Sequence, residues 1–560
     1  MKFLCALCVL CGFVSAACAL DREAFTFTKY NLDVRIEPEQ QRLGVRGHIT
    51  LRNDSSTPQK DLVLQISSSL DWRSITLGNK PVQFETHQYT SDIDHTGALS
   101  EAIVSLPNDV PPKETVELEV GYEGVIPLDA TRLTRIGLSE AKAAHIDWDQ
   151  IGKSFTAVRG IGYVAWYPIA TDAASLSEAD SVSQRTGQWL TREAEAELSI
   201  NVSDPGESSD GTAALYCGGR QVNDRKREKN LRSTLLGECF WAPMGLSVPT
   251  FVVANYQTLA AKGQVAVHYQ PNQKDAAEAY AEVASRPDLT VSLGGDETNL
   301  QILSLPDEDD ASFVTGNMLL MPLKSQLTNE AELNMVYALA RQKMLSSRPW
   351  IEEGLAHYAQ VAFIEAQKGR QAALDYLDAH KSVLLAENSI GSDRSLIAAP
   401  DDLYLQAKSM DVWWMLKEMT GDAFSEALQS YQVVDDKNPV SMQKVLEQKS
   451  KRNLQWFFDD WVYHNRGLPD FRVASVFSSP IKAGGYLVTV EVENLGSAGA
   501  EVPIILKTER EEIRSRLEIH AKSKASLRIE THSAPQEVTV NDGSVPESDV
   551  SNNSYKVASQ

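Results

Sequence analysis

Hydrophobic and polar residues alternate through most of the first 260 positions, at the spacing of β-strands. The clearest run is 114–122, where Val116, Leu118 and Val120 fall on one face of a strand. Turn-forming residues separate it from similar runs, at 30–36, 45–51, 62–66, 196–202 and 251–254. A polar stretch at 171–184 has the composition of a linker. The pattern predicts an N-terminal β-sandwich domain over residues 20–260.

The pattern changes after residue 260. A strand at 264–269, a helix at 275–285 and a strand at 300–305 are followed by apolar residues at helical spacing from 329 to about 458. Strand-like alternation returns in the last 90 or so residues, at 485–492, 502–507, 526–530 and 537–540. We therefore expect a multidomain α+β protein. Its mostly helical middle domain spans 261–468, and an immunoglobulin-like β-sandwich spans 469–560.

The N-terminal segment has the features of a secretory signal. Lys2 precedes a short apolar run, which ends in an Ala-x-Ala pattern with cleavage expected after Ala19. Residues 1–19 are then a signal peptide, and the protein is exported to the periplasm or the extracellular space. A lipid anchor at Cys18 is the less favoured alternative, because Ser15 stands where a lipoprotein signal prefers leucine. No later apolar run is long enough to span a membrane.

Cysteine usage agrees with export. Four of the 6 cysteines lie in the signal segment, and Cys217 and Cys239 remain after cleavage. Two cysteines that flank a hairpin-like stretch of an exported chain predict a disulfide, with Cα atoms less than about 7 Å apart. Two reduced thiols are the alternative.

The formal charge of −23 excludes classes of partner. Nucleic acids require a basic surface, and so does an anionic membrane. We expect neither as a partner.

The stretch Trp350-Ile-Glu-Glu-Gly-Leu-Ala-His-Tyr358 resembles a known motif. It is similar to the Trp-Leu-Asn-Glu-Gly-Phe-Ala-x-Tyr helix of the zinc aminopeptidases related to membrane alanyl aminopeptidase. Segments 408–424 and 456–471 also resemble that family and follow in the same order. The resemblance implies a thermolysin-like peptidase domain in the middle of the chain. It places Glu353 where the family has its third zinc ligand.

The zinc-binding helix of the family reads His-Glu-x-x-His, and three of its residues are replaced here. Tyr337 and Arg341 stand at the histidine positions, and Ala338 stands at the general base. A tyrosine ligates zinc only as phenolate, and an arginine is a permanent cation without a lone pair to donate. Residues 342–352 also form a shorter connection to the glutamate than the family has. None of the 10 histidines forms a His-x-x-x-His pair that could replace the site.

Two further family positions are changed. Leu319 stands at the glutamate that binds the substrate amine, and Gln406 stands at the tyrosine that stabilises the oxyanion. A leucine cannot pair with an ammonium group, whereas a glutamine can still donate a hydrogen bond. We expect Leu319, Gln406 and Glu353 to line one concavity, as their counterparts do in the family.

These changes predict a non-catalytic homologue that needs no cofactor. It would bind a peptide or protein in the cleft between its domains, or act as a scaffold in the cell envelope. A buried Glu353 without zinc requires another cation, and Arg341 is expected to pair with it or with Glu352. Glu353 and His357, one helical turn apart, are the best remnant of a metal site. Two ligands rarely hold zinc without a third, so His357 is expected to form hydrogen bonds within the helix packing. The alternatives are an active metallopeptidase with a divergent zinc site, and a hydrolase that uses other carboxylates.

Overall fold

The computed structural model describes residues 20–178, 181–204, 213–222, 234–261, 265–286, 289, 299–343, 346–399, 403–482 and 484–557. The predicted signal peptide, including Cys18, lies outside the described residues. Residues 344–345, between the two helices of the family motif, lie outside them as well.

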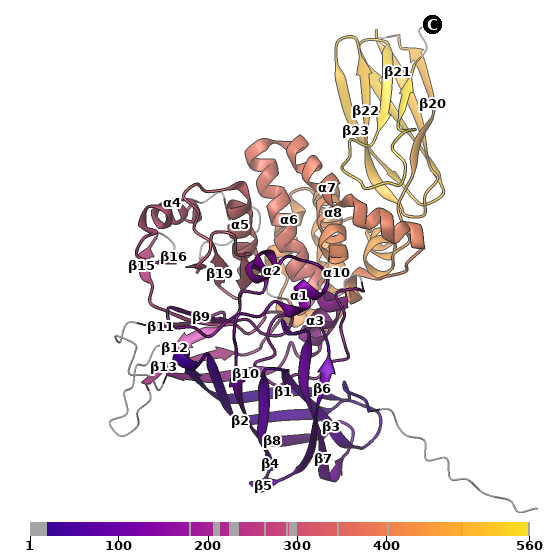
Figure 1. The fold of residues 1–560 in the computed structure, drawn as a ribbon. Coiled ribbons are helices and arrows are strands. Elements are labelled where there is room, and N and C mark those ends of the chain that lie inside the picture. The colour runs from indigo at the N-terminus through magenta and orange to yellow at the C-terminus, as the bar shows by residue number, and fades with distance from the viewer. Residues whose placement is uncertain are drawn as a thin grey trace, which may run out of the picture.

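Strands dominate the N-terminal region, in the lower part of Figure 1. An eight-stranded sheet has the order β12-β13-β10-β1-β2-β8-β4-β5, with β1 and β10 parallel. Side chains of β1 alternate between buried and exposed along most of the strand, as the sequence pattern predicts. The strands of this sheet are β1 (Phe25–Glu37), β2 (Arg42–Asn53), β4 (Leu70–Leu77), β5 (Lys80–Pro81), β8 (Thr115–Val125), β10 (Glu197–Asp204), β12 (Arg220–Val222) and β13 (Thr234–Trp241).

Two three-stranded sheets complete this region, in the orders β3-β7-β6 and β11-β14-β9. Their strands are β3 (Gln59–Ser67), β7 (Ala98–Val110), β6 (Gln83–Thr90), β11 (Ala214–Cys217), β14 (Phe251–Ala254) and β9 (Phe155–Val158). The connections contain η1 (Pro38–Gln40), α1 (Thr131–Arg135), α2 (Glu140–Ile146) and α3 (Ser181–Arg192). Helix α3 begins inside the stretch expected to be a linker. Its Trp189 and Leu190 are buried, so burial of these side chains holds the segment as a helix.

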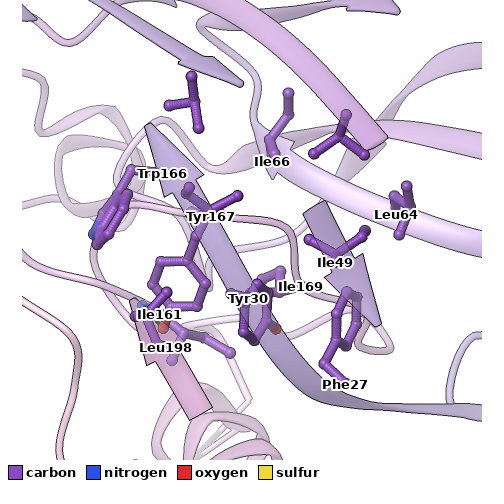
Figure 2. Close-up of a cluster of buried hydrophobic side chains, with 14 of the residues drawn as sticks. Phe27, Tyr30, Ile49, Leu64, Ile66, Ile161, Trp166, Tyr167, Ile169 and Leu198 are labelled. Atoms are coloured by element: carbon purple, nitrogen blue, oxygen red, sulfur yellow. Dashed lines mark hydrogen bonds between the residues drawn. The ribbon is translucent and has the colours of Figure 1, made fainter. Parts of the chain in front are cut away.

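Aromatic and aliphatic side chains together fill the core of the N-terminal region (Figure 2). The ring of Tyr30 packs edge-on against Tyr167, and Trp166 packs edge-on against Phe251. The buried hydroxyl of Tyr30 donates a hydrogen bond to the carbonyl of Pro168 at 3.0 Å, so its burial leaves no donor unsatisfied.

The middle region begins with a mixed sheet in the order β15-β16-β17-β19-β18. Its strands are β15 (Gln257–Ala260), β16 (Ala266–Tyr269), β17 (Gln301–Ser304), β19 (Met318–Met321) and β18 (Phe313–Thr315). Strand β15 already pairs with β16, so this sheet begins a few residues before the expected boundary at 261. The helices are α4 (Lys274–Ala284), α5 (Asn329–Lys343), α6 (Pro349–Lys368), α7 (Arg370–Ile390), α8 (Leu403–Thr420), α9 (Ala423–Ser430), α10 (Ser441–Ser450) and α11 (Gln455–Phe458), with the short turns η4 (Leu396–Ala398), η5 (Val433–Lys437) and η6 (Asp459–Tyr463).

Helices α6 and α8 pack closely at Gly354. A Cβ atom added there would lie 2.7 Å from the Cβ of Ser409, so only glycine permits this approach. One turn earlier, the rings of Trp350 and Trp413 stack with centroids 4.8 Å apart. The indole nitrogen of Trp413 donates to the carbonyl of Trp350 at 2.9 Å. This contact positions Glu352 and Glu353 of α6, which directly precede the glycine.

The C-terminal region consists of two small sheets, drawn in yellow in Figure 1. Their orders are β20-β21-β24 and β23-β22-β25-β26, and buried residues of both belong to one hydrophobic cluster with α6 and α8. The strands are β20 (Phe471–Pro480), β21 (Tyr486–Asn494), β24 (Lys524–Thr531), β23 (Glu512–Ile519), β22 (Ala500–Thr508), β25 (Pro535–Val540) and β26 (Ser554–Lys556). The molecule is thus a multidomain protein with strand-rich ends and a helix-rich middle. Among its described helices, none combines the length and the apolar character needed to cross a membrane.

Candidate functional site

Helices α5 and α6 bring together the residues that resemble the aminopeptidase motif. Tyr337 and Arg341 are one turn apart on α5 and therefore lie on the same face of that helix. Glu352 and Glu353 lie in the first turns of α6, and both are buried. The two helices meet despite the short connection between them.

The guanidinium of Arg341 lies against both glutamates. Its Nη2 atom is 2.6 Å from Oε1 of Glu353 and 3.1 Å from Oε1 of Glu352. The three side chains are between 3% and 8% exposed, so the charges interact away from bulk water. The structure therefore contains the contact expected of Arg341, and the cation bridges two carboxylates.

Other donors satisfy the remaining carboxylate oxygens. The hydroxyl of Tyr337 donates to Oε2 of Glu353. The backbone N–H of Ser346 donates to Oε2 of Glu352 at 3.1 Å. Arg341 also reaches the carbonyl of Leu246 at 3.5 Å, which connects this cluster to the N-terminal region. We call Tyr337, Arg341, Glu352 and Glu353 the charge cluster.

Burial changes the proton affinity within the charge cluster. It raises the pKa of the Glu352 carboxyl, and the neighbouring charge of Glu353 acts in the same direction. The cation of Arg341 opposes this rise. Glu352 can therefore take up a proton more readily than an exposed glutamate, which would leave one cation paired with one carboxylate.

His357 lies beside the charge cluster without joining it as a ligand. Its Nδ1 atom is 3.2 Å from Oε1 of Gln360, and its ring centroid is 4.8 Å from that of Tyr337. Burial lowers the pKa of the imidazole, which favours its neutral form. The side chain thus takes part in the packing of α5 against α6, the role expected for it.

The charge cluster does not fit zinc. A zinc site of this type needs three protein groups with lone pairs, and one of the three positions holds a guanidinium instead. The Nη2 atom of Arg341 lies at hydrogen-bond distance from Glu353, where a metal would have to coordinate. A divalent cation here would meet a fixed positive charge. Glu353 alone retains the chemistry of a family ligand.

Leu319 lies in the core and not in an open concavity. It has no exposed surface and belongs to a buried cluster with Met335 and Leu339 of α5. Its neighbours on β19, Met318 and Leu320, point to the opposite face of the sheet, as alternation along a strand requires. The expectation that Leu319, Gln406 and Glu353 line one concavity is therefore wrong for Leu319, and Glu353 is buried as well, at 2% exposed. Gln406 is half-buried on α8.

The predicted disulfide is confirmed. Cys217 and Cys239 are bonded, with Cα atoms 6.4 Å apart. The bond does not cross a hairpin, however. Cys217 lies in β11 and Cys239 in β13, and these strands belong to different sheets. The chain between them adds β12 to the edge of the larger sheet, so the disulfide connects two layers of the N-terminal region.

A second group of metal-ligating side chains lies elsewhere. In the described part of the chain, ligand atoms of His145, Asp307 and Asp309 are within 4.8 Å of one another. The two aspartates are exposed, and Nδ1 of His145 already contacts Asp310 at 3.2 Å. None of these residues stands at a family position, so the group does not restore the zinc site.

Two buried ionisable residues of α8 were not identified from the pattern. Lys408 is 2% exposed and Asp411 is 5% exposed, one turn apart on a helix that is apolar on most sides. In the sequence they are the two charged residues of the stretch 403–416, which otherwise holds apolar and uncharged polar residues. Lys408 borders a small cavity, to which we return below.

Asp411 should make the stability of the protein depend on pH. Burial raises the pKa of its carboxyl to about 8, Lys381 of α7 opposes the rise and Asp378 adds to it. The folded state thus holds a proton on Asp411 that the unfolded chain releases near pH 4. Because the unfolded state binds fewer protons between these two pKa values, the free energy of unfolding falls as the pH rises toward 8. Asp411→Asn mimics the protonated form. Relative to wild type, its free energy of unfolding should increase by up to about 1.4 kcal/mol for each pH unit between pH 6 and 8. Urea unfolding at both pH values measures this, and a difference independent of pH would contradict it.

Comparison with known proteins adds no relative. The sequence matches no protein-family model, and a search of curated proteins finds no match.

Proposed function

We propose that this chain is an exported, non-catalytic relative of the zinc aminopeptidases. Its middle region would be a thermolysin-like domain that has lost its metal, and its C-terminal region an immunoglobulin-like sandwich. In this view the protein binds peptides or proteins without cleaving them, or holds partners together in the cell envelope. The signal-like N-terminus and the disulfide support an oxidising compartment outside the cytoplasm.

One observation carries the proposal. The guanidinium of Arg341 pairs with Glu353 at 2.6 Å, and Tyr337 donates to the same carboxylate. In the family this glutamate would have a lone pair free for zinc. Here its oxygens accept hydrogen bonds from two side chains of α5, so the hydrolytic water has neither a metal nor the general base to activate it.

The absence of hydrolysis can be tested with a panel of aminoacyl chromogenic substrates and short unblocked peptides. We expect no turnover above the buffer rate, with or without added zinc, because Ala338 and Leu319 cannot replace the two lost glutamates. Binding is measured in parallel by equilibrium dialysis of the same peptides, which should be retained and recovered intact. Hydrolysis that a chelator or Glu353→Gln abolishes would contradict the proposal in favour of a divergent metallopeptidase. Peptides that are neither bound nor cleaved would remove its peptide-binding part.

A further inference from the structure

A buried lysine amine borders a cavity where α7, α8 and the segment 461–468 meet. The walls of this cavity include Leu384 and Asn388 of α7, Tyr404 of α8, and Trp461 and Gly467. The Nζ atom of Lys408 belongs to a side chain that is almost fully buried. The cavity is small, with room for about one water-sized molecule.

Two hydrogen bonds hold the amine in place. Nζ donates to the hydroxyl oxygen of Tyr404 at 2.9 Å and to Oδ1 of Asn465 at 3.0 Å. The Tyr404 hydroxyl itself donates to the carbonyl of Arg394 at 2.7 Å, so its oxygen is an acceptor toward the lysine. The Asn465 amide nitrogen donates to the carbonyl of Ser392 at 2.8 Å, which turns its oxygen toward Nζ.

This arrangement suits a neutral amine. An ammonium group has three N–H donors, whereas the described residues offer Lys408 two acceptors. A neutral amine has two N–H donors and one lone pair, so both donors are satisfied and the lone pair remains available on the cavity side. An electrophile inside the cavity would meet that lone pair.

Electrostatics agree with the hydrogen bonds. Burial lowers the pKa of Lys408 to about 7, although the carboxylates of Glu387 and Asp393 act in the opposite direction. The third charged group nearby is Arg394, whose guanidinium lies 4.8 Å from the centre of the Tyr404 ring. About half of the Lys408 amines are then neutral at pH 7, against less than about 0.1% for a lysine with the reference pKa of about 10.4.

We propose that Lys408 is a nucleophilic site that captures a small aldehyde of the size of formaldehyde. The amine lone pair attacks the carbonyl carbon and forms a carbinolamine. The aldehyde oxygen then leaves as water with two hydrogens from the amine nitrogen, and an imine remains. No oxidant, reductant or cofactor is needed. The protonated imine keeps one N–H donor for Tyr404 or Asn465.

An aldehyde suits the cavity better than carbon dioxide, the other electrophile of this size. A carbamate would add a negative charge to a buried cavity that Glu387 already borders. The imine adds no negative charge. The inference does not depend on the proposed function of the chain, since the charge cluster lies on α5 and α6.

The test is reductive trapping on the purified full-length protein at pH 7. A low concentration of isotope-labelled formaldehyde is added with cyanoborohydride, which reduces the imine to a methylamine, and peptides are mapped by mass spectrometry. We expect label at Lys408 at least about tenfold faster than at Lys417, which lies on the same helix with its side chain 33% exposed. The rate at Lys408 should level off above about pH 8, where an amine of this pKa is fully neutral. Label at Lys417 that equals or exceeds that at Lys408 would overturn the proposal.

Two further experiments test whether the captured molecule is an aldehyde and whether Lys408 is the residue that captures it. Labelled bicarbonate in place of formaldehyde should leave no carbamate signal, and a carbamate at Lys408 would overturn the assignment to aldehydes. Lys408→Met should lose the labelled peptide and no other. If that variant does not fold, mapping of the wild-type protein still decides the question, because it needs no substitution.

Discussion

Arg341→Ala should lower the free energy of unfolding by about 3–5 kcal/mol, as expected when one partner of a buried ion pair is removed. The change leaves Glu352 and Glu353, both almost fully buried, without a compensating cation. Tyr337 and Ser346 still donate to them but carry no charge. Urea unfolding at pH 7 measures the loss directly.

A matched ion pair provides the control. Lys417 of α8 contacts Glu365 of α6 at 2.9 Å, but both side chains are about a third to a quarter exposed. Lys417→Ala should therefore lower the free energy of unfolding by less than about 1 kcal/mol. The triple variant Arg341→Met, Glu352→Gln and Glu353→Gln should recover most of the loss, because it removes the charges together. A cost for Arg341→Ala no larger than that for Lys417→Ala would show that the charge cluster is not held by Arg341.

Removal of the disulfide should have an effect of similar size. The bond joins cysteines 22 positions apart, and closing a loop of this length stabilises a folded protein by about 3 kcal/mol. Cys217→Ala combined with Cys239→Ala should lower the free energy of unfolding by about 2–4 kcal/mol. Wild-type protein unfolded with and without a reductant serves as the control, since reduction breaks the bond without changing a residue. Equal urea midpoints under both conditions would contradict the prediction.

Elements defined by local periodicity could be predicted from the sequence. Strands such as β1 and helices such as α5 were located because alternation and helical spacing are properties of neighbouring residues. The contact between Arg341 and Glu353 could also be predicted from the sequence, since the motif aligned the two helices and a buried carboxylate requires a cation. The disulfide was predicted from export and from the two remaining cysteines.

Features that depend on the pairing of segments distant in sequence could not be predicted. The hairpin expected around the disulfide failed because the sequence does not show that β11 leaves the larger sheet and pairs with β14. The face of β19 on which Leu319 lies depends on which helices cover the sheet. The cavity at Lys408 is built from three separate segments of the chain, so no local pattern could reveal it.

The measurement that most directly tests the account is total-metal analysis of the purified protein after zinc loading and dialysis. Because a guanidinium pairs with Glu353, the residue that the resemblance places at the third zinc ligand, the account predicts no stoichiometric zinc, and none gained on further incubation. About one zinc per chain, retained through dialysis and lost in Glu353→Gln, would contradict it and restore the reading of a divergent metallopeptidase.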